Sequence, residues 1–540
     1  MSSNDGAQTP TDNPGDPGNP GGPDSPDARD AQAAPGALPV DRRFFGHPVG
    51  LMTLFGTELW ERFSYYGMRA ILLYYLTDTI ANGGLGLDTD TGLAVTSIYG
   101  ASVYLLSVVG GWLADRVIGS RRATLYGGVV IAAGHVLLAV PGGAGVSFAG
   151  IVGVAIGTGL LKPNVSSMVG ELYERGDDRR DSGFSIFYMG INIGSFTAPF
   201  LVGLARGVGG YHAGFAVAAV GMALALVAFV LGRAQLRGAG DRVANPLTPA
   251  DRPMLVRGGL LLVALLTLAG LLALAVTSLT AGEPTFGTSG IVNMISYLAF
   301  AAPIIYFVVM LRSPKVTAPE RSRVRAYIPL FVAAMLFWMI FEQAASSLSA
   351  YAESRTVLDF LGVTIQPEFF QSVNPALIIL LAPVFALLWM RLGSRGPSTA
   401  VKFGIGLGLA SLSFLFLAGM TALAGDGLVS SWVLVGTYAL QTLGELCLSP
   451  VGLAATTMLA PVAFRSQSMA LWFLAPAAGQ AITAQIVSAT SNLTESFVPY
   501  FATIGGVTLG LTVVFFFFTP WITRHVAAGE EGLSGEVASR

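Results

Sequence analysis

Residues 501–522 read FATIGGVTLGLTVVFFFFTPWI, an apolar run without a charged side chain. An α-helix needs about 20 such residues to cross the hydrocarbon core of a bilayer. Two similar runs, at 255–278 and 401–424, carry one basic residue near their start. Charged residues make up only 11% of the 540 residues, and the mean hydropathy is +0.64. These charges are too few to solvate a soluble protein of this length, so the sequence predicts a membrane protein with many spans.

The expected spans are α-helices, because backbone groups must be hydrogen-bonded within the bilayer and the runs are too long for barrel strands. Residues 1–43 are expected to form a disordered tail instead, since Pro, Gly, Asp and Ser dominate there and little apolar surface is available for burial. The fourteen predicted helices lie at 48–78, 91–115, 122–141, 147–169, 182–205, 212–232, 255–278, 289–311, 325–350, 369–391, 401–424, 430–458, 466–489 and 498–523.

Basic residues gather in every second connection between these helices, which orients the chain. Of the 30 Lys and Arg residues, only Arg206 and Arg355 fall in the opposite set of connections, while Arg62, Arg69 and Lys162 fall inside helices. Because basic connections stay in the cytoplasm, we expect both termini to be cytoplasmic and the location to be the inner (cytoplasmic) membrane. The sequence contains no basic stripe of the kind that is typical of nucleic-acid-binding proteins.

The predicted domain organisation is a pair of six-helix halves with an insertion between them. Two six-helix bundles around a central path form the major-facilitator fold, here an all-α polytopic protein with an inserted two-helix hairpin. The segment GWLADRVIGSRR at 111–122 is similar to the cytoplasmic signature loop of that superfamily, where Asp115 and the arginines are expected to form a breakable ionic latch. The expected parts are a cytoplasmic tail at 1–43, bundles at 44–234 and 321–524, linkers with the inserted pair at 235–320, and a tail at 525–540.

Ionisable residues within the spans mark candidate sites, because each costs roughly 2.5–3.5 kcal/mol on insertion. Four are acidic and three basic, so pairing leaves one carboxylate to hold a proton. At 100° per residue, most of those on the helix at 48–78 share one face with Tyr65. Arg62 is expected to neutralise only one of its two neighbouring carboxylates. The candidates are Glu58, Glu61, Arg62, Arg69, Lys162, Glu342 and Glu445.

Plainer interpretations stand beside these. The charges at 58–69 would be solvated at an interfacial helix end, Lys162 would reach the cytoplasmic interface, and Asn192 would hydrogen-bond only a neighbouring helix. Apolar sequence on both sides of 58–69 argues against the first of these.

Three motifs, in this order, resemble the proton-dependent oligopeptide transporter family of bacterial type: ELWERFSYYG at 58–67, LKPN at 161–164 and FSIFYMGINIG at 184–194. The resemblance covers about residues 45–525. It implies a proton-coupled symporter that imports di- and tripeptides by alternating access, driven by the proton gradient without a cofactor, in a monomer embedded in the lipid bilayer.

The resemblance also implies roles for single residues. Glu58, Glu61, Arg62 and Glu342 would couple transport to protons. Arg69 and Lys162 would bind the peptide carboxylate, and Asn192, Asn374 and Glu445 the α-amino group. The bridges Arg69–Glu342 and Lys162–Glu445 would close the outer side. The side-chain pockets would be lined by Tyr65, Tyr66, Tyr104, Trp338, Ser449, Trp472 and Phe473.

Other functions remain to be weighed. A carrier of another small anion or of a peptide-like drug would use the same charges. A membrane-embedded enzyme would need a catalytic histidine, an aspartate pair or a metal cluster near an interface, whereas the four histidines are scattered at 47, 135, 212 and 525. We therefore expect a transporter and not an enzyme.

Overall fold

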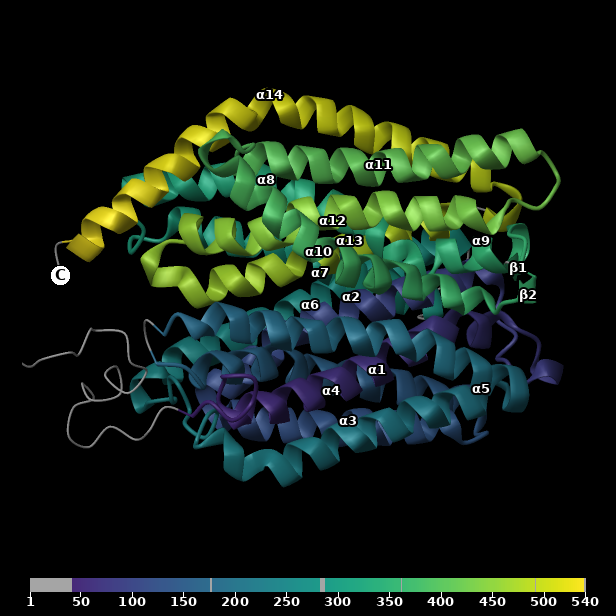
Figure 1. Cartoon of the computed structure of the whole chain (residues 1–540), viewed down its shortest axis with the longest axis horizontal. Helices are drawn as coiled ribbons and strands as arrows, with labels where there is room; N and C mark the ends of the chain where they lie inside the picture. The colour runs from purple at the N-terminus through teal and green to yellow at the C-terminus, as the bar shows by residue number, and fades with distance from the viewer. Residues whose placement is uncertain (1–40, 175–176, 282–286, 361, 491, 539–540) are drawn as a thin grey trace, which may run out of the picture.

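The computed structural model describes residues 41–174, 177–281, 287–360, 362–490 and 492–538, and these residues are almost entirely helical (Figure 1). The all-α prediction is confirmed. The helices are α1 (Val49–Thr77), α2 (Thr89–Leu113), α3 (Ser120–Ala139), α4 (Gly143–Glu171), α5 (Arg179–Gly232), α6 (Arg252–Ala281), α7 (Thr288–Arg312), α8 (Ala318–Phe341), α9 (Ser347–Arg355), α10 (Val373–Leu392), α11 (Thr399–Ala424), α12 (Ser431–Leu459), α13 (Arg465–Ala489) and α14 (Phe497–Ala538).

Eleven helices of the described residues are long and apolar enough to cross a membrane. Helix α1 is not among them, and its span holds four charged side chains. Helix α5 counts once although its 54 residues cover two predicted spans. Its two halves are separated by Gly210, whose φ of 75° is not helical. Gly190 in the first half of α5 lies against Phe55, and Gly232 in the second half lies against Thr53. The two halves therefore form a hairpin, and both pack beside α1.

The predicted helix at 325–350 is broken in the structure. Helix α8 ends at Phe341, a 3₁₀ turn (η7) covers Glu342–Ala345, and α9 starts after Ser346, which has φ −122° and ψ −99°. Apolar composition continues across this point, so hydropathy alone does not reveal the break. Two short strands, β1 (Asp359–Phe360) and β2 (Val363–Thr364), pair in the connection that follows α9 and were not predicted.

Both chain ends also differ from prediction. Residues 1–40 of the predicted tail lie outside the described residues, but Asp41 is already buried and pairs with Arg43 at 3.0 Å. The Arg43 guanidinium holds the pKa of Asp41 well below its usual range. At the other end α14 continues to Ala538 instead of stopping near 523, because a helix without a further proline need not end where its apolar run ends.

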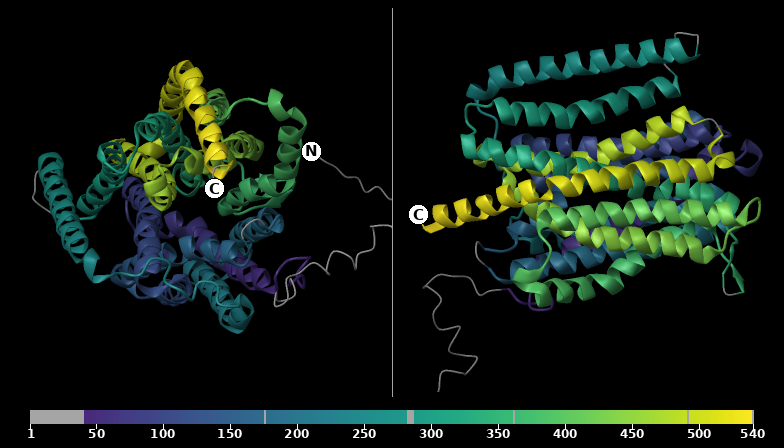
Figure 2. Two further views of the ribbon diagram at one scale, coloured as in Figure 1. Left: turned by 90° about the vertical axis from the view of Figure 1, so that its left-hand side faces the viewer. Right: turned by 90° about the horizontal axis from the view of Figure 1, so that it is seen from above.

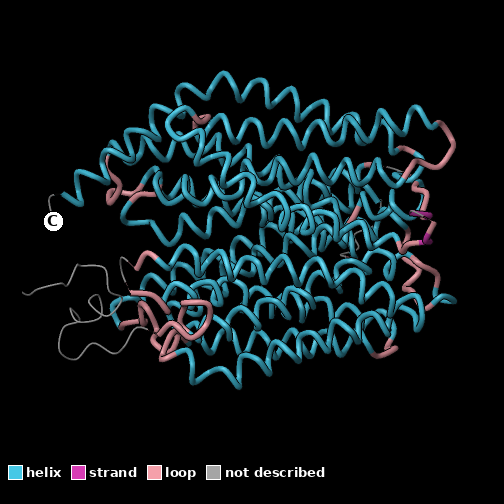
Figure 3. Tube along the Cα trace, viewed as in Figure 1, coloured by secondary structure: helices cyan, strands magenta, loops and turns pink. Residues whose placement is uncertain are grey.

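The helices form two bundles that lie side by side, the N-terminal one drawn in purple to blue and the C-terminal one in green to yellow (Figure 1). One buried core gathers residues between Leu51 and Ala239, and a second is built mostly from residues between Phe307 and Ile522. The loops lie at the two ends of the bundles (Figure 3). We call the end with Asp41 and the C-terminus the basic end, and the end with β1 and β2 the hairpin end.

The inserted helices α6 and α7 lie at the edge of the molecule (Figure 2). Helix α7 contacts both bundles, through α2 of the first and α13 of the second. The Gln485 amide of α13 donates to Asn293 Oδ1 at 2.9 Å and to Ser296 Oγ at 3.1 Å on α7. Helix α6 packs mainly on α7 and exposes most of its side chains.

The linker between α5 and α6 is bound to the basic end of the first bundle by two ion pairs. Arg116 pairs with Asp251 at 3.0 Å, and Arg121 pairs with Asp241 at 2.6 Å. No ion pair of Asp115 is present among the described residues, and two of the three arginines, Arg116 and Arg121, instead bind linker aspartates; the expected latch stays a prediction. The division into domains predicted from the sequence otherwise stays a prediction.

Candidate functional site

Helix α5 packs against the apolar side of α1, at Phe55, Leu59 and Phe63, so the charged side chains lie on the other side of α1. A Cβ atom on Gly194 would lie 2.3 Å from the carbonyl oxygen of Leu59, so only glycine allows this approach. Behind this contact, Arg62 Nε lies 3.2 Å from Glu58 Oε1 and 2.5 Å from Glu61 Oε2. All three side chains are at most 3% exposed. We call these three residues the acid cluster.

Arg62 thus contacts both carboxylates. One guanidinium still balances only one negative charge. Glu58 Oε2, Glu61 Oε1 and Arg62 Nη2 are buried without a hydrogen-bond partner in the structure. A buried ionised group without full pairing is costly, so a proton that neutralises one carboxylate stabilises the acid cluster.

Two turns further along α1, Arg69 joins the bundles. Its guanidinium pairs with the Glu342 carboxylate and donates to the Glu342 carbonyl oxygen at 3.1 Å. The Tyr104 hydroxyl of α2 donates to Glu342 Oε1 at 3.1 Å. The break after α8 places Glu342 here, and the predicted Arg69–Glu342 bridge is present in the structure.

Lys162 lies beside this bridge without joining it. Its Nζ is 4.0 Å from the centroid of the Tyr104 ring, and no ion pair to Glu445 forms within the described residues. Glu445 on α12 instead accepts a hydrogen bond from Asn374 Nδ2 at 3.0 Å, and that amide also donates to Thr442 Oγ1 at 3.0 Å. Lys162 and Glu445, the cation and the anion of the second predicted bridge, therefore have separate partners in this structure.

The remaining predicted residues are mostly aromatic and pack against neighbouring rings. Tyr65 lies against Tyr66 and Tyr99, with ring centroids 5.1 and 6.3 Å apart, and Trp338 packs edge-on against Phe341. Neither Trp338 Nε1 nor Ser449 Oγ has a partner in the structure, and both atoms are buried. Asn192 instead donates to the Tyr188 carbonyl of its own helix at 2.9 Å. Trp472 is buried near Phe403, and Phe473 is half-buried.

An ion pair at the hairpin end was not predicted. Arg206 at the turn of α5 forms two hydrogen bonds, of 2.9 and 2.8 Å, with the Glu368 carboxylate, which is fully buried. Arg206 also lies 5.2 Å from the centroid of the Tyr74 ring. The sequence held half of this signal, since Arg206 stands out as a basic residue in the opposite set of connections, but nothing marked Glu368.

Further polar contacts between the bundles gather in the same half of the molecule. The Tyr74 hydroxyl donates to the Ser349 carbonyl at 3.1 Å, and the Ser372 hydroxyl donates to the Phe196 carbonyl at 2.8 Å. Asp90 of α2 accepts a hydrogen bond from the Asn492 backbone at 3.0 Å. The bundles are therefore held together from Arg69 to the hairpin end.

The architecture and these motifs match known transporters. A family model described as the POT family matches residues 121–506. The chain belongs to the POT family. The predicted resemblance is thereby confirmed, and with it the class of polytopic transporters, which are not enzymes.

Several POT relatives are close. The Di-/tripeptide transporter of Lactococcus lactis subsp. lactis is 46% identical, over 88% of this chain and 96% of that protein. The Uncharacterized transporter YclF of Bacillus subtilis is 48% identical, over 89% and 95%. A crystal structure of a mutant peptide transporter POT in complex with alafosfalin has a TM-score of 0.82 and 51% identity, over 90% of this chain and 97% of that one.

Proposed function

We propose that this POT-family protein is a proton-coupled symporter of di- and tripeptides that works by alternating access. The observation that carries the proposal is the arrangement on α1, where the acid cluster and the Arg69–Glu342 bridge lie on one rigid helix. A change of charge at the first is therefore two turns away from a contact that joins the bundles. The name of the Lactococcus relative, a di-/tripeptide transporter, supports the choice of substrate.

The proton is assigned to the acid cluster by charge balance. Two buried carboxylates share one guanidinium, so binding one proton removes the uncompensated charge. Glu342 is the second proton-binding group, because its protonation would weaken the pair with Arg69 and release the bundles.

The peptide is assigned by the separation of charges across the central path. A short peptide is a zwitterion, so its two ends need a cation and an anion on opposite walls. Lys162 has no carboxylate partner within the described residues and is free to bind the peptide carboxylate together with Arg69. On the other bundle, Asn374 donates a hydrogen bond that positions the Glu445 carboxylate, which would bind the ammonium group of the peptide. Half-buried aromatic residues such as Tyr66 and Tyr104 suit varied side chains.

The state of the molecule follows from the same contacts. The bundles are joined at the hairpin end, and the basic end is the cytoplasmic one if the basic loops stay inside. The structure then corresponds to a transporter closed to the outside in the cytoplasmic membrane, with both termini in the cytoplasm. We propose a monomer that needs no cofactor, since both bundles of the path belong to one chain.

Uptake into proteoliposomes tests the proposal. An inward proton gradient should drive accumulation of a labelled dipeptide, and unlabelled di- and tripeptides should compete. N-acetylated and C-amidated dipeptides serve as matched probes, because each lacks one of the two charges and both should compete poorly. If unmodified dipeptides fail to compete, the peptide assignment is wrong.

A second candidate is a carrier of peptide-like drugs, favoured by the relative that holds alafosfalin. The same assay separates the two. A peptide transporter is inhibited by many unrelated dipeptides, whereas a drug carrier would be inhibited by alafosfalin and spared by dipeptides.

A further inference from the structure

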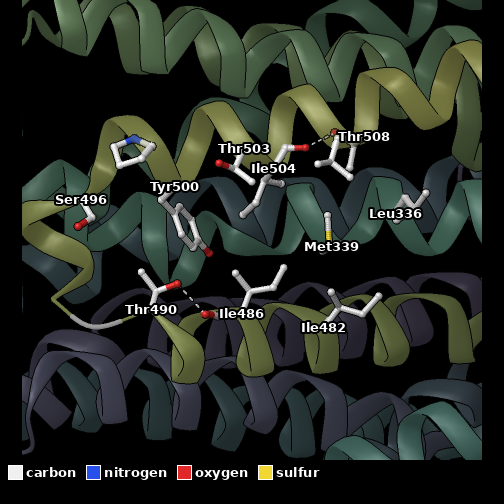
Figure 4. A pocket seen from close by; sticks show the side chains of 12 residues that line it. Leu336, Met339, Ile482, Ile486, Thr490, Ser496, Tyr500, Thr503, Ile504 and Thr508 are labelled. Carbon is white, nitrogen blue, oxygen red and sulfur yellow. Dashed lines mark hydrogen bonds between the residues drawn. The ribbon is translucent and has the colours of Figure 1, made fainter.

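A groove runs along the outside of the C-terminal bundle, away from the central path. Helices α13 and α14 both pack on α8 but leave a gap between them. The gap is a cavity of about 570 Å³, within the range of small-molecule sites of ~300–1,000 Å³. Figure 4 shows Leu336 and Met339 of α8 on its floor, with Ile482 and Ile486 on one wall and Ile504 on the other.

Three of the five polar side chains that line the groove, Thr490, Tyr500 and Thr508, are engaged in hydrogen bonds. Thr490 donates to the Ile486 carbonyl at 2.8 Å and Thr508 to the Ile504 carbonyl at 2.6 Å, so both turn their hydroxyls to their own helix. The Tyr500 hydroxyl donates to Gln343 Oε1 at 2.8 Å. A buried water needs about 2–4 polar partners, and these side chains do not offer them. The walls instead present methyl and methylene groups.

The groove opens sideways, toward the membrane. Val507 on its rim is 58% exposed, and Thr503 is also exposed. Both belong to the part of α14 that is apolar enough to span a bilayer, so the opening faces the acyl-chain region. At the hairpin end the groove closes on Ser496, at the start of α14.

We propose that an acyl chain of a membrane phospholipid occupies this groove, with its headgroup toward the hairpin end. A mostly apolar slot that opens at hydrocarbon depth, with its inner hydroxyls bonded within the protein, fits such a chain. The chain would rest on Met339, whose carbonyl oxygen accepts hydrogen bonds from Gln343 and Thr483 at 3.0 and 3.1 Å. It would thus contact α8 one turn before Glu342.

Photo-crosslinking of the whole protein in nanodiscs tests this proposal. The probe is a phosphatidylcholine with a diazirine near the end of one acyl chain, and the labelled residues are identified by mass spectrometry. Residues 482–508 of the α13 and α14 walls should be labelled more strongly than the other lipid-facing segments. The measurement does not depend on transport, so it stands or falls separately from the proposed function.

Groove-filling variants sharpen the result. Val507→Trp and Thr503→Trp place an indole at the rim and should each lose most of the groove labelling. Val513→Trp is the matched control, because Val513 lies on the same helix, is 53% exposed and does not line the groove. Its labelling of the groove should equal that of the unaltered protein.

Two results would overturn the proposal. One is labelling of the groove in the unaltered protein that is no stronger than labelling of the exposed face of α14. The other is groove labelling that Val507→Trp and Thr503→Trp leave unchanged.

Discussion

The acid cluster concentrates three ionisable groups at a buried position. Glu58 and Glu61 approach the same nitrogen of Arg62, and one oxygen of each carboxylate has no partner. Removing a charge from such a cluster changes its balance more than removing one from a solvated surface, where pairs contribute about 0–1 kcal/mol. Substitutions here should therefore alter coupling to protons.

Glu61→Gln should abolish accumulation of a dipeptide against its gradient while leaving counterflow measurable, because the amide no longer exchanges a proton. Uptake in proteoliposomes with and without a pH gradient measures this. Glu495→Gln is the control, since Glu495 is exposed and should behave as the unaltered protein. Undiminished accumulation by Glu61→Gln would remove this residue from the proton path.

Lys162→Ala should weaken competition by dipeptides about tenfold or more, since a hydrogen bond to a charged group contributes about 1.5–3 kcal/mol. The effect is read from the concentration of unlabelled dipeptide that halves counterflow. Lys402→Ala is a matched control, because Lys402 Nζ also lies over an aromatic ring, 4.4 Å from the Trp389 centroid, but near the start of α11. Equal losses in the two variants would contradict a specific role for Lys162.

At this scale the sequence was informative about which residues matter and less so about their partners. Buried charges are costly, so Glu58, Glu61 and Arg69 stand out in an apolar run without any structure. The pairing of Arg206 with Glu368 depends on two connections 162 residues apart, and no local pattern brings them together.

Among the elements, close helix contacts depend on single glycines. A Cβ on Gly110 of α2 would lie 2.1 Å from the Gly159 carbonyl oxygen of α4, whereas a Cβ on Gly111 would lie at an ordinary 3.8 Å from Pro163. The two positions are neighbours on one helix, so they make a matched pair.

Gly110→Ala should destabilise the protein by about 1–3 kcal/mol, because the backbone of α4 cannot yield as a side chain would. Gly111→Ala should be neutral or slightly stabilising, since alanine favours the helix. Thermal unfolding in detergent compares them. Equal midpoints for the two variants would show that α2 and α4 are less closely packed.

The elements themselves were largely predictable, because helices in a bilayer must be long and apolar. The predicted connection between 182–205 and 212–232 contains Gly210, where α5 reverses. The error is the break after Phe341, which falls inside the predicted helix at 325–350 and brings Glu342 to Arg69. Hydropathy measures how long a run is and does not record where it turns.

In the whole molecule, the proposed transport cycle requires the contacts at the hairpin end to break, so we expect them to stabilise the form that is closed there. The Arg206–Glu368 pair joins the two bundles at this end, with the side chains 15% and 0% exposed. Removing one partner of a buried pair costs about 3–5 kcal/mol. Glu368→Gln should therefore shift the population toward a form open at the hairpin end, by tenfold for each 1.4 kcal/mol lost.

Thiol labelling measures this shift, since Cys447 is the one cysteine of the sequence and is buried. An added Ala70→Cys lies at the bundle contact, where the Ala70 carbonyl accepts from Gln371. Its labelling should become faster with Glu368→Gln. Asp241→Asn breaks a pair between the first bundle and the linker and should leave the rate unchanged. Equal rates in all three proteins would contradict a closing role for Glu368.

The reversal at Gly210 also has a consequence for biogenesis. At 1.5 Å per residue the 54 residues of α5 would extend about 80 Å, far beyond the ~30 Å of hydrocarbon. Because the connection between the halves is short, we expect them to enter the membrane together as a helical hairpin. A side chain at Gly210, whose φ is 75°, would strain the reversal on which that hairpin depends.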